Sequence, residues 1–172
     1  MHSIAWWPTL IAVTIATVSD IRSRRIPNWL VVPFLAAGII VSAATGGWRG
    51  LGQSVLGLSL AGVLMGILYW LGGTGMGDVK LCVAIGAWIG PGQLGIALVM
   101  MGITGGVMAL LWAAFGGHLS ESVNGAGDLI LGARKRGLRP HPTLQLASPS
   151  ARKMPYAPAI AVGTLFSFLA VR

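Results

Sequence analysis

The sequence predicts an all-α membrane protein of about six transmembrane helices, and its composition supports this fold class. Of the 172 residues, 55% are hydrophobic and only 9% are charged, and the mean hydropathy is +0.78. About a quarter of the residues of a soluble domain are charged. Glycine is abundant, at 26 residues, which lets helix backbones approach closely in lipid. We therefore expect one transmembrane domain over residues 1–172.

Apolar windows of nearly membrane-spanning length recur along the chain. They cover residues 4–19, 29–45, 55–71, 79–90, 94–115 and 157–171. A helix needs about 20 apolar residues to cross a bilayer. The fourth window is short and stops before Pro91. Either its helix begins inside the glycine-rich stretch 72–77, or it packs in a locally thinned bilayer.

The basic residues predict how the chain is oriented. With the N-terminus outside, only Arg49 and Arg172 lie outside, and all other connections that carry Lys or Arg face the cytoplasm, as the positive-inside rule requires. The segment 116–152 is polar and basic, and we expect it to form a long cytoplasmic loop. It either lies on anionic headgroups or only fixes the topology. The cytoplasmic basic residues are Arg22, Arg24, Arg25, Lys80, Arg134, Lys135, Arg136, Arg139, Arg152 and Lys153.

Several function classes are disfavoured by the same composition. A net charge of +8 would suggest nucleic-acid binding in a soluble protein, but here the charges lie in loops without interleaved aromatic residues. We therefore expect no nucleic-acid partner. A single cysteine, Cys82, excludes an internal disulfide and a multi-cysteine zinc site, and we expect it to be buried. Neither a metal nor a cofactor is predicted. His2, His118 and His141 lack ordered partners for a catalytic triad.

Two of the four acidic residues, Asp20 and Asp78, lie where apolar runs end on the predicted cytoplasmic face. A carboxylate at the edge of a bilayer is costly and is usually retained for chemistry or transport. Because both residues face the same side, they can meet as an aspartic protease dyad. Glu121 and Asp128 lie in the basic loop, where solvated charges are the default. For Asp20 alone, capping or pairing with a nearby arginine is also open.

Three short motifs surround these acids. The first runs from Asp20 to Asn28 as D-I-R-S-R-R-I-P-N. In it, Pro27 cannot continue the preceding helix but can open the next one. The second, G-M-G-D-V-K, runs from Gly75 through Gly77 and Asp78 to Lys80, and it matches neither a phosphate loop nor a dinucleotide fingerprint. The third, P-Y-A-P, spans Pro155 to Pro158 and opens the last apolar window.

Together these motifs resemble those of the prepilin peptidase family, the membrane aspartic peptidases with a G-x-G-D motif. The resemblance covers residues 1–115 and about 153–172, but not the basic loop. It implies that Asp20 and Asp78 are the catalytic pair. The motif residues that would support them are Gly75, Gly77, Lys80, Pro27, Asn28, Pro155 and Pro158.

The resemblance also implies the substrate and the location. The substrate would be a prepilin with a basic leader and a hydrophobic helix, cut at the cytoplasmic face of a bacterial inner membrane. The chain lacks the N-terminal paired-cysteine region of larger members, so it is similar to the short members of tight-adherence (Flp-type) pilus systems, and methyltransferase activity is in doubt. Two other readings remain, a small ion- or proton-coupled transporter and a non-enzymatic pilus-assembly scaffold, and homo-oligomerisation is left open.

Glycines spaced by four residues predict tight helix contacts. Such pairs occur at Gly62 and Gly66, at Gly86 and Gly90, and at Gly102 and Gly106. In the last apolar window, Gly163 permits close packing against another helix.

Overall fold

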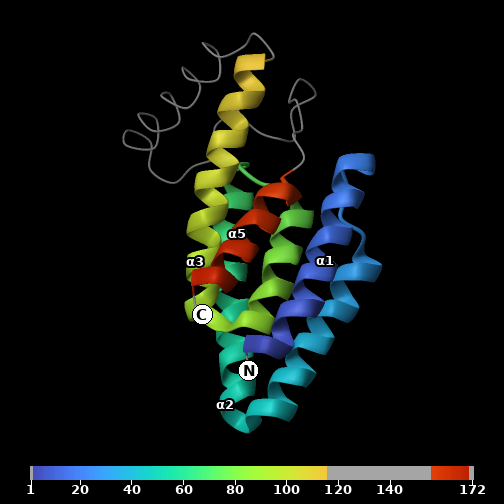
Figure 1. Ribbon diagram of the computed structural model, residues 1–172, viewed down its shortest axis with the longest axis vertical. Coiled ribbons are helices and arrows are strands. Elements are labelled where there is room, and N and C mark those ends of the chain that lie inside the picture. The colour runs from blue at the N-terminus through green and yellow to red at the C-terminus, as the bar shows by residue number, and fades with distance from the viewer. Residues whose placement is uncertain (1, 116–155, 171–172) are drawn as a thin grey trace.

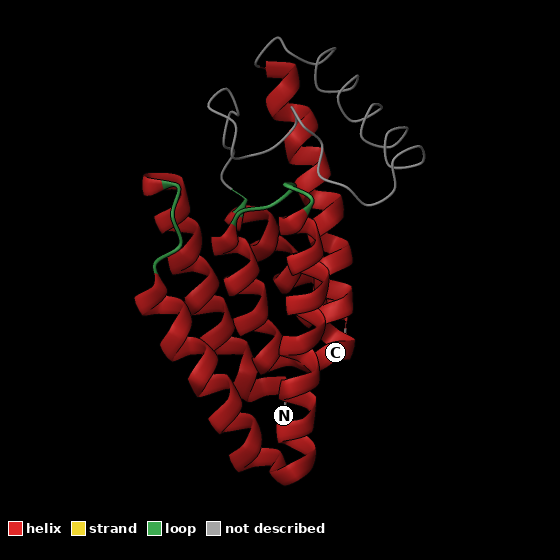
Figure 2. Ribbon diagram, turned by 180° about the vertical axis from the view of Figure 1, so that it is seen from behind, coloured by secondary structure: helices red, strands yellow, loops and turns green. Residues whose placement is uncertain are grey.

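The computed structural model describes residues 2–115 and 156–170, and in this part of the chain all regular secondary structure is helical, joined by short loops (Figure 2). It contains α1 (His2–Ser23), α2 (Asn28–Trp70), α3 (Met76–Phe115) and α5 (Ala157–Ala170). The all-α prediction is confirmed for these residues. The predicted basic loop 116–152 lies outside the described residues.

The helix α2 reverses its direction at Gly47. A straight helix of 43 residues would be about 65 Å long, about twice the thickness of a bilayer core. Gly47 instead has φ 56° and ψ −142°, a conformation that residues with a side chain rarely adopt. The chain therefore descends through residues 28–46 and returns through residues 48–70 (Figure 1). We expected a longer connection, over residues 46–54, but one glycine makes this turn.

The helix α3 is divided in the same way at Gly90, where φ is 72° and ψ is 175°. Pro91 follows and opens the second half, a position in which its missing N–H costs nothing. The first half begins at Met76, inside the glycine-rich stretch. Of the two alternatives for the short fourth window, the structure thus shows an early helix start. Figure 1 shows this half running antiparallel to the second half of α3.

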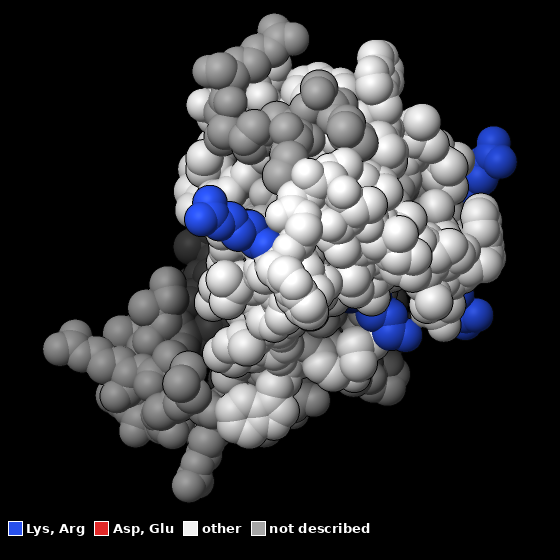
Figure 3. Space-filling view, turned by 90° about the horizontal axis from the view of Figure 1, so that it is seen from below, with Lys and Arg blue, Asp and Glu red and all other residues white. Residues whose placement is uncertain are grey.

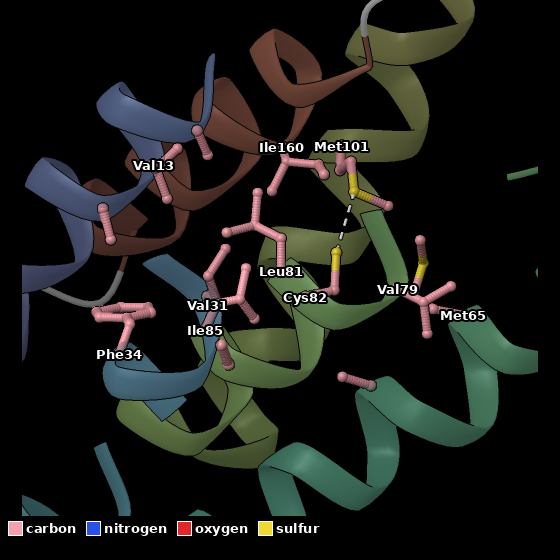
Figure 4. Close-up of a cluster of buried hydrophobic side chains, with 14 of the residues drawn as sticks. Val13, Val31, Phe34, Met65, Val79, Leu81, Cys82, Ile85, Met101 and Ile160 are labelled. Carbon is pink, nitrogen blue, oxygen red and sulfur yellow. Dashed lines mark hydrogen bonds between the residues drawn. The ribbon is translucent and has the colours of Figure 1, made fainter. Parts of the chain in front are cut away.

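The core lies where both halves of α3 meet the other helices (Figure 4). Leu81, Ile85 and Ile160 are almost fully buried there. Cys82 is also buried, as predicted, and its thiol lies 3.9 Å from Sδ of Met101 in the second half of α3. The cysteine thus packs as a small apolar residue below the first turn of α3.

Glycine contacts only partly follow the predicted pairs. Gly86 packs directly on the backbone of Gly57 in α2, so a Cβ on Gly86 would lie 2.6 Å from the Gly57 carbonyl oxygen. Gly163 is equally close to the α3 backbone, as expected, since its Cβ would lie 2.7 Å from N of Met101. The pair Gly102 and Gly106 was wrongly predicted, because among the described residues no other helix places an atom within 4 Å of either Cβ position.

The second incorrectly predicted pair is Gly62 and Gly66. Only Val83 approaches the Cβ position of Gly62, at 3.7 Å, and nothing approaches that of Gly66. The four-residue spacing identifies glycines on one helix face, but that face need not meet another helix.

In the part of the chain that the structure describes, two helices are long and apolar enough to cross a membrane, over the ranges Asn28–Trp70 and Met76–Leu111, and the shorter Ala157–Ala170 is also apolar. Seen from below, the described surface is mostly uncharged, with scattered basic side chains and no acidic side chain in view (Figure 3). The four tryptophans Trp7, Trp29, Trp48 and Trp70 are all exposed. Such a surface suits contact with lipid.

Candidate active site

The first carboxylate, Asp20, lies in the last turns of α1 and is only 7% exposed. Its Oδ2 accepts a hydrogen bond of 3.0 Å from the backbone N–H of Ala157. Ala157 is the first residue of α5, and the free N–H groups at a helix N-terminus favour an ionised acceptor. The start of the last helix therefore holds the Asp20 carboxylate in place.

The second carboxylate, Asp78, lies in the first turn of α3. Its Oδ2 accepts a hydrogen bond of 3.3 Å from the backbone N–H of Gly75. Asp78 is close enough to Asp20 for their charges to interact. Two segments that are distant in the sequence thus carry carboxylates that influence each other electrostatically.

The connection between α1 and α2, residues 24–28, folds back on the end of α1. The N–H of Arg24 donates to the carbonyl oxygen of Asp20 at 2.8 Å, and the Ser19 hydroxyl donates to the carbonyl oxygen of Arg25 at 2.9 Å. Arg24 has φ 50°, a rare conformation for a residue with a side chain. Pro27 then caps the N-terminus of α2, as predicted for the residue that opens the next helix. We call residues 24–28 the strap.

The strap also touches the start of α3. A Cβ on Gly77 would lie 3.3 Å from Cβ of Ile26, so the strap crosses closely over this glycine. Farther along, Nζ of Lys80 donates a hydrogen bond of 3.2 Å to Oδ1 of Asn28. The first two predicted motifs are therefore in direct contact with each other.

Tyr156 is a site residue that the sequence analysis missed. It immediately precedes α5 and is partly buried. Burial raises the pKa of its phenol, and the nearby charge of Asp78 raises this pKa further. Its ring and hydroxyl pack so tightly on Gly105 of α3 that a Cβ there would lie 2.6 Å from Cζ. The only signal in the sequence was its place between two prolines of the third motif.

Of the alternatives for Asp20, the structure shows capping of a helix end, through the bond from Ala157 of α5, and not pairing with an arginine. In the described part of the chain, its carboxylate is bound by a backbone N–H and forms no ion pair with Arg22, Arg24 or Arg25. Pro158 lies in the first turn of α5. His118, Glu121, Asp128, His141 and Pro155 lie outside the described residues. Within the described ranges, no three His, Cys, Asp or Glu residues come together as metal ligands.

A comparison with protein-family models decides the family. Residues 7–117 match the model described as the type IV leader peptidase family. The chain belongs to this family. No curated protein and no solved structure is significantly similar to it.

The family match defines the broad activity of the chain. This family member is a prepilin-type peptidase, and it therefore acts on a protein substrate. Together with the two long apolar helices, the match identifies a membrane protein. Both Asp20 and Asp78 lie inside the matched range, whereas Tyr156 and Ala157 lie beyond it.

Proposed function

We propose that the chain is an aspartic endopeptidase in which Asp20 and Asp78 together hydrolyse one peptide bond of a prepilin-like substrate. The observation that supports this proposal is the electrostatic interaction between Asp20 and Asp78, although α1 and α3 supply them separately. The structure gives each carboxylate its own backbone N–H donor. Both side chains are thus held in fixed positions, as acid–base catalysis requires.

The chemistry follows from the proximity of two like charges. Two neighbouring carboxylates do not both ionise cheaply, so one keeps a proton and the pair offers an acid and a base together. The ionised group takes a proton from water as the water attacks the scissile carbonyl. The protonated group polarises that carbonyl and then donates its proton to the leaving amine. The water oxygen ends on the new carboxyl group.

The substrate follows from where the pair lies. We propose six membrane-crossing segments, namely α1, the two halves of α2, the two halves of α3, and α5. The charge asymmetry of the connections then places the end with Asp20 and Asp78 at the cytoplasmic face of a bacterial inner membrane. A prepilin with a cytoplasmic leader and a hydrophobic helix would present its cleavage site at that depth.

The orientation is tested by labelling cysteines from outside. Cys82 is buried, so it gives a low background. In intact cells, a membrane-impermeant maleimide should label Trp48→Cys, at the 88% exposed Trp48 beside the α2 turn, but not Ile21→Cys. The opposite labelling pattern would contradict the orientation.

The peptidase proposal is tested by co-expression with candidate prepilins. The wild type should convert the prepilin to a faster-migrating form. Asp20→Asn and Asp78→Asn should each lower the rate by about 10³-fold or more, since removing one member of a catalytic unit removes most of its effect. Membrane insertion should be unchanged. Efficient processing by either variant would remove that residue from the mechanism.

The same experiment separates the two other functions. A transporter or a pilus-assembly scaffold would leave the prepilin uncut by the wild type as well. Neither of these functions requires two carboxylates to meet at the end of the bundle, which is the feature that the peptidase uses.

A further inference from the structure

The helix that carries Asp20 has few contacts with the helix that carries Asp78. In the described residues α1 packs mainly on α5 and touches α2 and α3 only at limited places. Two carboxylates that share a proton need a fixed separation, and small displacements are expensive for catalysis. Other contacts must therefore set the distance between the end of α1 and the start of α3.

The strap, residues 24–28, is placed to do this. One end of it is tied to α1 through hydrogen bonds to the carbonyl oxygen of Asp20 and from the hydroxyl of Ser19. Its other end is tied to α3 by the bond from Lys80 to Asn28. Between these ends, Ile26 lies over Gly77, the residue before Asp78.

We propose that Asn28 and Lys80 are a positioning pair whose hydrogen bond holds the strap on α3 and thereby sets Asp20 against Asp78. This inference rests on the proposed peptidase function, which makes the separation of the two carboxylates matter. It gives Asn28 and Lys80, the last residues of the first and second motifs, a role other than proton transfer.

The geometry favours positioning over direct catalysis. Nζ of Lys80 is engaged by the strap amide, Oδ1 of Asn28, at 3.2 Å. Lys80 and Asp78 are two residues apart on α3, so their side chains leave the helix in different directions. Both Asn28 and Lys80 are exposed, so the bond between them supplies geometry more than folding energy.

The first test uses four variants in a purified assay with a prepilin. Asn28→Leu keeps the size but removes the acceptor, and Lys80→Met keeps the length but removes the donor. Each should lower kcat about tenfold with KM unchanged, and the double variant should be no slower than either single one. Asn28→Asp keeps an acceptor for Lys80 and should retain near-wild-type kcat.

The matched control is Arg22→Met. It removes one cytoplasmic positive charge, as Lys80→Met does, from an exposed residue at the end of α1. It should leave kcat unchanged. If the losses in kcat of the two single variants multiply in the double variant, the positioning role is wrong. It is also wrong if KM rises while kcat stays constant.

A second measurement is independent of activity. Spin labels at Ile21→Cys on α1 and Val107→Cys on α3, with Cys82→Ala, report the distance between these helices in lipid. The wild-type background should give one narrow distance distribution, and Asn28→Leu should broaden or shift it. An unchanged distribution would overturn the inference. A broadened distribution in a protein that cuts no prepilin would instead refute the proposed function alone.

Discussion

Two regions of this molecule are assembled by different means. In the middle of the bundle, α2 and α3 meet backbone to backbone where Gly57 faces Gly86. At the end that carries Asp20 and Asp78, the segments are joined by separate hydrogen bonds and partly exposed side chains. The first region offers no space for a side chain, whereas the second depends on few directional contacts. Packing therefore builds the scaffold, and hydrogen bonds hold the two carboxylates proposed as catalytic.

This difference predicts how the two regions respond to mutation. A change in the packed region should affect folding and activity together, because a misplaced helix misplaces everything attached to it. If the proposed site is correct, a change at the end that carries Asp20 and Asp78 should affect activity while the protein stays folded, since each exposed hydrogen bond there contributes little to stability.

The largest effect on folding is expected for Gly86→Leu. Its new side chain would collide with the Gly57 backbone, 2.6 Å from the carbonyl oxygen and 2.8 Å from the carbonyl carbon. Backbone cannot move aside as a flexible side chain does, so we expect a loss of about 3 kcal/mol in stability. Thermal unfolding in detergent and the yield of inserted protein would measure this loss.

The matched control for that prediction is Gly66→Leu on α2. In residues 2–115 and 156–170 nothing outside its own helix lies within 4 Å of its Cβ position, so the same added volume should enter open space and leave the unfolding temperature almost unchanged. Equal losses of stability in both variants would mean that the close contact between Gly57 and Gly86 is not the cause of the effect of Gly86→Leu.

A smaller and more selective effect is expected for Gly105→Leu. The added side chain would displace the ring of Tyr156, and Tyr156 precedes the residue whose N–H binds Asp20. We expect processing to fall about tenfold with insertion retained, because a displacement of about 1 Å at a site is costly for catalysis. The prepilin mobility shift and thermal unfolding, measured on the same preparation, would separate the two effects.

The neighbouring Gly106→Leu is the control for this variant. Gly106 is exposed and has no atom within 4 Å of its Cβ position. It should process prepilin at the wild-type rate. If Gly106→Leu is as slow as Gly105→Leu, the contact with Tyr156 is not the cause.

Much of the fold was predictable because the apolar pattern and the prolines act locally. The helix starts near Pro27 and Pro158, the buried Cys82 and the close approach at Gly163 all follow from single residues and their neighbours. The distribution of basic residues predicts that Asp20 and Asp78 share the cytoplasmic face, and this stays a prediction.

The features that could not be predicted are those that depend on which helix faces meet. The spacing of Gly102 and Gly106 indicates that they share a helix face, but not whether another helix packs on that face. The contact between Gly57 and Gly86 joins two helices whose sequences share no pattern that would predict it. The hydrogen bond from Ala157 to Asp20 involves a backbone group, which carries no sequence signature.

The central claim is that Asp20 and Asp78 share a proton, and the composition allows a direct measurement of it. The chain has three aspartates, Asp20, Asp78 and Asp128. Labelling the aspartate carboxyl carbons with ¹³C therefore gives three resonances that single Asn variants assign. These resonances can be followed by NMR through a pH titration in lipid nanodiscs.

We expect the Asp20 and Asp78 signals to titrate as a coupled pair. Asp20→Asn should shift the titration midpoint of Asp78, whereas Asp128→Asn should leave it unchanged. Two independent single-site curves for Asp20 and Asp78, each unaffected by replacing the other residue, would contradict the shared proton and the mechanism built on it.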